Sequence, residues 1–282
     1  MKWMAISIFP VTKVEECRLI EQLQLEIWGG DGLEVTPDHL LLTMAKEGGV
    51  VLLATTDSGQ PVGFGYGFLA MTEAGRLKLA SHQVGVLPAY QNTGLGLKLK
   101  LAQREIALAR QLDLITWTFD PLQSRNARLN LRKLGAVSQT YLCNLYGDMR
   151  DELNQGLPTD RFRVDWWLTS THVVDRLAGR SPELWHSSSE CPLLNPATIL
   201  DNGLAAPADI FDWPTREFCL VEIPADLAQL KTQAPELALK WRWQTRQLFE
   251  SAFASGYTAV DLLRREERSY YLLQKDWQPD GA

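Results

Sequence analysis

A polar turn between a strand-like run and a helical run is the first place where backbone chemistry is expected. The turn follows Gln83-Val84-Gly85-Val86 and a proline, reads Gln91-Asn92-Thr93-Gly94-Leu95-Gly96, and opens a helical pattern that extends to about residue 112. A helix N-terminus presents unpaired N–H groups and the positive end of its dipole, and glycine lets a ligand approach the backbone. The turn therefore predicts a phosphate site, although an ordinary strand-helix loop would use glycines in the same way.

A second strand-turn-helix segment follows the first. Leu114–Phe119 is a β-branched and aromatic run, which predicts a strand, and Asp120-Pro121 ends it because proline cannot continue a central strand. Ser124 can cap a short helix, and Gly135 suits the left-handed position just past the end of that helix. The two segments together predict two strands that are each followed by a helix.

These motifs resemble those of the GNAT superfamily of N-acyltransferases. Gln91-x-x-Gly94-x-Gly96 is similar to the acyl-CoA-binding signature of that family, and 124–135 is similar to its helix with Asn-x-x-Ala…Tyr-x-Lys-x-Gly. Asn126, Lys133 and Gly135 match, whereas Leu131 stands where the family often has a tyrosine as general acid. The blocks 116–127 and 144–162 resemble a subgroup of predicted acetyltransferases whose substrate is not settled. The resemblance implies acetyl-CoA or another acyl-CoA as co-substrate.

The resemblance also implies a fold and a set of coenzyme contacts. The fold would be α+β, with a GNAT-like mixed, mostly antiparallel central sheet flanked by helices and a C-terminal α+β extension. A bulge in the strand before the turn would free an N–H for the thioester carbonyl, near Val86. The expected coenzyme-binding residues are Val84, Val86, Gln91, Asn92, Thr93, Gly94, Leu95, Gly96 and Asn126.

Three side chains are candidates for proton transfer. His82 precedes the turn on the same strand and titrates near neutral pH, so it can accept a proton from the attacking amine, directly or through water. Tyr141 and Tyr146, expected on the strand after Gly135, are phenols that can replace the missing donor at Leu131. Each of the three can instead be a packing residue, and catalysis by positioning with water as shuttle is a further alternative.

The order of patterns divides the chain into three parts. Residues 1–170 are expected to form the coenzyme-binding domain, because its strands and helices follow the family's order. Residues 171–215 are rich in proline, serine and asparagine and predict an irregular connection, which in compact proteins is often a functional cover or a linker. Residues 216–282 predict a C-terminal α+β subdomain, with strands at 216–223, 257–263 and 269–274 and helices at 225–231 and 235–255.

Composition limits the classes of partner. A net charge of −6 argues against nucleic acid, and no apolar stretch approaches the ~20 residues of a membrane span. The start has no signal-peptide pattern, and the scattered cysteines and histidines predict reduced thiols and no metal site. We therefore expect a cytoplasmic enzyme that acetylates a small-molecule amine such as an amino acid or its derivative. The alternative is a catalytically silent acyl-CoA sensor, and a homodimer is left open.

Overall fold

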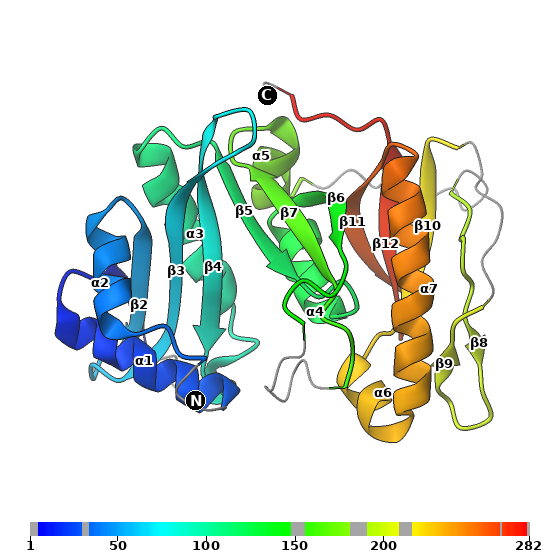
Figure 1. The fold of residues 1–282 in the computed structure, drawn as a ribbon, viewed down its shortest axis with the longest axis horizontal. Helices are drawn as coiled ribbons and strands as arrows, with labels where there is room; N and C mark the ends of the chain where they lie inside the picture. The colour runs from blue at the N-terminus through cyan, green and yellow to red at the C-terminus, as the bar shows by residue number, and fades with distance from the viewer. Residues whose placement is uncertain are drawn as a thin grey trace. The chain divides into compact units, whose positions relative to one another are not determined.

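The computed structural model describes residues 5–29, 34–147, 156–180, 191–208, 216–265 and 267–280. These residues form two compact units, which we call unit 1 (described residues up to Trp117) and unit 2 (from Thr118 onward). Figure 1 traces the elements of both units along the chain. Each unit is considered by itself below.

Unit 1 is a sheet with helices packed against it. Its strands follow the order β1 (Ile6–Pro10), β2 (Val50–Thr56), β3 (Pro61–Met71), β4 (Leu77–Val86) and β5 (Leu114–Phe119). The first four strands pair antiparallel, whereas β4 and β5 are parallel. The helices are α1 (Val14–Trp28), α2 (Asp38–Lys46) and α3 (Leu95–Ala109), with a short 3₁₀ turn, η1 (Pro88–Tyr90), before α3.

The alternation of glycine and aromatic residues in β3 gives the sheet two different faces. Phe64 and Tyr66 belong to a buried cluster with residues of α1 and α2. On the opposite side, a Cβ added at Gly63 would lie 3.3 Å from Leu95, and one at Gly65 would lie 3.6 Å from Gln103. The glycines therefore let α3 approach β3 closely, which fixes where the N-terminus of α3 lies relative to β4.

Unit 2 is a second α+β arrangement. Its strands follow the order β7 (Arg161–Trp167), β6 (Val137–Leu142), β11 (Tyr257–Arg265), β12 (Arg268–Lys275) and β10 (Phe218–Ile223), all antiparallel. Its helices are α4 (Ser124–Ala127), the π-helical η2 (Arg128–Lys133), α5 (Thr171–Leu177), α6 (Leu227–Gln233) and α7 (Pro235–Ala254), and β8 (Thr198–Ile199) pairs with β9 (Ala205–Ala206). The predicted fold class, a mixed and mostly antiparallel α+β fold, is confirmed.

The division into units differs from the predicted boundaries at residues 170 and 215. The end of β5 and α4 are joined to the C-terminal strands, since Ser124 Oγ lies 2.7 Å from Ser269 Oγ and Tyr271 donates to the carbonyl of Pro121. The segment 171–215, predicted to be irregular, contains α5 and the β8–β9 hairpin, and the Ser170 hydroxyl caps α5 by accepting from the N–H of Val173. The serines at 187–189 lie outside the described residues.

Candidate functional site

The loop before α3 has the geometry of an anion site. Gly94, at the N-cap, is left-handed (φ 87°), and no side chain caps the helix. Asn92 is also left-handed (φ 62°), and the hydroxyl of Thr93 donates to the carbonyl of Tyr90 at 2.7 Å. Nothing lies within 4 Å of a Cβ added at Gly94, so the space beside this N-cap residue is open. The loop can therefore hold a phosphate through backbone N–H groups.

Strand β4 leads into this loop with one edge unpaired in unit 1. Its parallel pairing with β5 consists of two residue pairs, Leu79 with Ile115 and Ala80 with Thr116, whereas β4 continues to Val86. The N–H of Leu87 donates to Val62 on the β3 side, so by strand alternation the backbone groups of Val84 and Val86 face the other edge. Gln91 Nε2 donates to the Val86 carbonyl from that edge at 3.2 Å. The expected coenzyme residues of unit 1 thus follow one another along an open edge and the loop.

The bulge in β4 lies at His82, not near Val86 as predicted. Tyr66 pairs with Gln83 and Gly67 pairs with Ser81, so His82 is the extra residue, and the pairing is regular from Val84 to Val86. The ring of His82 lies edge-on to Tyr66 and Phe68, with centroids 5.6 and 6.1 Å apart. Partial burial against these rings lowers the pKa of His82, which leaves the imidazole neutral at pH 7 and able to accept a proton.

Tyr146 lies beyond the end of β6, in the turn after it, and not on the strand as predicted. Its hydroxyl is 2.9 Å from Thr118 Oγ1, and the guanidinium carbon of Arg161 lies 5.4 Å from its ring centroid. The side chain is 47% exposed, so a ligand can reach the hydroxyl. Thr118, which is half-buried near the end of β5, was not predicted as a site residue, and no signal in the sequence pointed to it.

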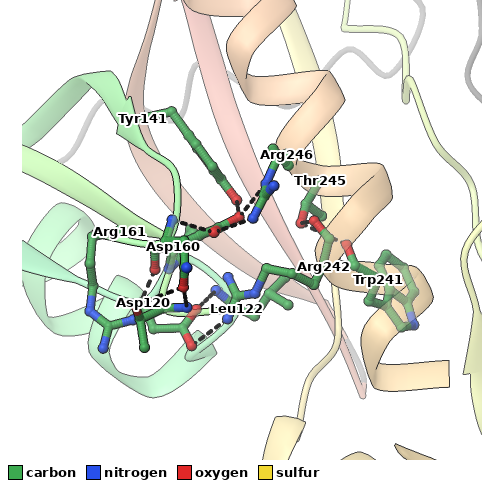
Figure 2. Close-up of polar contacts among 12 residues, drawn as sticks. Asp120, Leu122, Tyr141, Asp160, Arg161, Trp241, Arg242, Thr245 and Arg246 are labelled. Atoms are coloured by element: carbon green, nitrogen blue, oxygen red, sulfur yellow. Dashed lines mark hydrogen bonds and ion pairs between the residues drawn. The ribbon is translucent and has the colours of Figure 1, made fainter. Parts of the chain in front are cut away.

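Tyr141, by contrast, is engaged in a network that joins α7 to β6 and β7 (Figure 2). Its hydroxyl donates to Asp160 Oδ2 at 2.7 Å, and Arg246 donates to both oxygens of the same carboxylate at 2.8 and 2.6 Å. Arg242, which is fully buried, pairs with Asp120 at 2.6 Å. Burial raises the pKa of the Tyr141 hydroxyl well above its ordinary value. This geometry favours a structural role for Tyr141.

The helix after β5 differs from the family pattern in two ways. Counting back from Ala127, the pattern Asn-x-x-Ala places its asparagine at Ser124, whose hydroxyl contacts Ser269, whereas Asn126 is exposed on α4. Leu131, at the position of the family's tyrosine, is fully buried in η2. Position 131 therefore faces the core of unit 2, and a coenzyme contact at Asn126 stays a prediction.

No family model matches the chain, and no curated protein matches it. Among solved structures it resembles Naa50 of Arabidopsis thaliana in complex with a bisubstrate analogue, at 17% identity over 57% of this chain and 97% of that one, with a TM-score of 0.45. It also resembles an IAA acetyltransferase from Bacillus cereus, at 13% identity over 57% and 98% of the two chains, with a TM-score of 0.42. A chain of the NatC complex bound to Gag peptide and CoA covers 59% of this chain and 100% of its own, at 16% identity and a TM-score of 0.46.

Among the described residues, no helix combines the length and apolar character that crossing a membrane requires.

Proposed function

We propose that the protein is an N-acyltransferase that uses an acyl-CoA, with acetyl-CoA as the preferred donor. The observation that carries this proposal is the open edge of β4 leading into the uncapped N-terminus of α3. An arm with amide groups, such as pantetheine, can pair with the backbone of Val84 and Val86 as an added strand would. The pyrophosphate at the end of the arm then meets the N–H groups around Gly94.

The chemistry requires a neutral amine, a polarised thioester carbonyl and a donor for the leaving thiolate. The amine nitrogen attacks the carbonyl carbon, the C–S bond breaks, and the amide and the CoA thiol are released. His82 is the proposed acceptor of the amine proton, because its imidazole is neutral at pH 7. Tyr146 is the proposed donor to the thiolate, because its hydroxyl is accessible and held by Thr118. We propose a small-molecule amine as acceptor, motivated by the acidic chain.

A second candidate is an acyl-CoA-binding protein without turnover. The buried Leu131 favours it, since the usual proton donor is missing and its position faces the core. The two candidates differ in thiol release. Acetyl-CoA is mixed with amino acids, polyamines and peptides with free N-termini, and CoA thiol is followed with a chromogenic reagent. Release above the background rate supports the transferase, whereas coenzyme binding without release supports the silent protein. Absence of coenzyme binding at millimolar concentration contradicts both.

His82→Ala is expected to lower turnover by ~10²–10⁴-fold with little change in acetyl-CoA affinity, because a general base acts in the transition state. In the wild type the rate should rise as pH increases through the lowered pKa of His82, and this rise should disappear in the variant. The rate is measured between pH 5 and 9. His39→Ala, a matched change at an exposed histidine of α2, should leave the profile unchanged. A fully active His82→Ala enzyme would make His82 a packing residue.

Tyr146→Phe is expected to lower turnover by at least ~10-fold at unchanged stability, because it removes one accessible hydroxyl and little volume. Tyr141→Phe is the matched control: it deletes a donor to Asp160, so it should destabilise the protein by ~1–2 kcal/mol and leave turnover per folded molecule intact. Steady-state rates and urea unfolding separate the two effects. If Tyr141→Phe lowers turnover per folded molecule and Tyr146→Phe does not, Tyr141 is the proton donor.

A further inference from the structure

Unit 1 contains a buried lysine that the proposed mechanism does not use. Lys100 belongs to α3, and only 5% of it is exposed. Its Nζ donates to Ser81 Oγ at 2.9 Å and lies 3.7 Å from the ring centroid of Trp117. Within the described part of the chain, no carboxylate forms an ion pair with it. Lysine is almost never this buried without a counterion, so the amine needs an explanation.

The buried amine reduces stability. Burial lowers the pKa of Lys100 from 10.5 to about 7, and the Trp117 face partly offsets this by favouring the charged form. Ser81 from β4 and Trp117 from β5 contact Nζ, and neither carries a charge, while Arg104 follows one turn later on α3. A residue that lowers the stability of the fold in this way is typical of a functional position.

The position of the amine is specific. The last residue pair between β4 and β5 is Ala80 with Thr116, and Ser81 and Trp117 are the next residues on each strand. The Lys100 amine therefore contacts both strands at the point where their pairing ends. The hydroxyl of Ser81 also donates to Gln103 Oε1 at 2.9 Å, so α3 holds Ser81 through two side chains. The next residue along β4 is His82, the bulge.

We propose that Lys100 is a positioning residue of the coenzyme site. By bridging Ser81 and Trp117, it fixes the place where β4 leaves β5 and thereby holds the His82 bulge and the open edge up to Val86 in the geometry that an acyl-CoA arm requires. This inference rests on the proposed function, because it assigns the open edge to the coenzyme. Lys100 would thus belong to the coenzyme site although it lies outside the loop before α3 and is not one of the proton-transfer groups.

Lys100→Met tests the bridge, because methionine keeps the length and volume of the side chain and removes the amine. The variant should have a higher midpoint of thermal unfolding than the wild type, since the desolvated amine is gone. It should nevertheless exchange those amide hydrogens of 81–86 that bond to β3 ~10-fold faster, bind acetyl-CoA more weakly and turn over up to ~10²-fold more slowly. Lys98→Met, the same change at an exposed position of α3, should alter none of these.

The midpoint of thermal unfolding should also depend on pH, because the protonation of the Lys100 amine differs between the folded and the unfolded protein. The folded pKa of Lys100 is lower than the unfolded one, so between about pH 7 and 10 the unfolded chain binds a proton that the folded chain does not. The contribution of Lys100 to the wild-type unfolding midpoint should therefore become more favourable as pH rises through that window. Lys100→Met should lose this gain, and Lys98→Met should keep it.

Ser81 supplies the rescue experiment. Ser81→Ala removes the acceptor and should reproduce the faster exchange and weaker binding, whereas Ser81→Thr keeps a hydroxyl and should restore both. If wild-type protein binds acetyl-CoA and Lys100→Met binds it equally well with unchanged exchange at 81–86, the positioning role is overturned and the proposed function stands. If the wild type binds no acyl-CoA, both are overturned together.

Discussion

Gly94→Val is expected to abolish acetyl-CoA binding while the protein stays folded. Gly94 has a φ of 87°, so valine is strained there, and its side chain would occupy the open space at the N-cap of α3. A pyrophosphate and a β-branched side chain cannot share that space. Calorimetric titration with acetyl-CoA should show at least a ~10³-fold loss of affinity, or about 4 kcal/mol.

Gly59→Val is the control that separates loss of the phosphate site from the effect of backbone strain. Gly59 has nearly the same φ, 82°, and it too has nothing within 4 Å of an added Cβ, but it lies in the turn between β2 and β3. Both variants should lose a similar ~1–2 kcal/mol of stability from backbone strain. Only Gly94→Val should lose the coenzyme. Wild-type affinity in a folded Gly94→Val protein would mean that the phosphates bind elsewhere.

Asp160→Asn is expected to destabilise the protein more than any exposed charge change. Asp160 is fully buried and accepts from Tyr141, from both ends of the Arg246 fork and from the backbone N–H of Asn144. The asparagine amide has no negative charge to pair with Arg246. Its NH₂ group also replaces one carboxylate oxygen, so a donor faces the donors that the oxygen used to accept from. The free energy of unfolding should fall by ~2–4 kcal/mol, somewhat less than for a pair without any solvent contact.

The same variant should change the response to acid. Burial alone would raise the pKa of Asp160, but the hydrogen bonds from Arg246, Asn144 and Tyr141 outweigh it and hold the pKa below its ordinary value. The ionised carboxylate thus stabilises the fold above about pH 4, and this contribution is lost as pH falls through the lowered pKa. Urea melts at pH 7 and pH 3 should show the difference between wild type and Asp160→Asn shrinking in acid.

Asp175→Asn is the matched control for both measurements. Asp175 is bound by two nitrogens of Arg180, but both side chains are substantially exposed. Its loss should change the free energy of unfolding by at most ~0.5 kcal/mol. An Asp160→Asn protein as stable as this control would mean that the network in Figure 2 contributes little.

Local patterns predicted most of the elements. Leu114–Phe119 was predicted with the bounds that β5 has, because a β-branched run stops at Asp120-Pro121. The predicted helix at 235–255 agrees with α7 to within one residue, since the proline in its first turn defines its start. The turn before α3 was predicted because glycine can adopt the left-handed conformation that Gly94 has, and its role as a phosphate site stays a prediction.

Long-range contacts explain what was missed. The bulge falls at His82, next to Ser81, which α3 holds through Gln103, and no residue type near 82 signals that contact. Lys100 resembles any exposed helical lysine in the sequence, and only Trp117 and Ser81, brought together by strand pairing, make it a buried one. The predicted domain boundaries at residues 170 and 215 follow a shift in composition and stay a prediction, whereas the division into compact units at Trp117 depends on which strands meet.

The ties between α4, η2 and the C-terminal strands determine the order in which the two units can fold on the ribosome. Asp120 meets Arg242, Arg132 meets Asp261 and Ser124 meets Ser269, across separations of 122, 129 and 145 residues. Unit 1 has all of its described residues within the first 117 and can fold while translation continues. Unit 2 must wait, with its strands β6 and β7 unpaired on one side, until β11 and β12 have been synthesised. Since such distant contacts slow folding and leave strand edges exposed, nascent chains paused between residues 170 and 250 should be the form most dependent on chaperones.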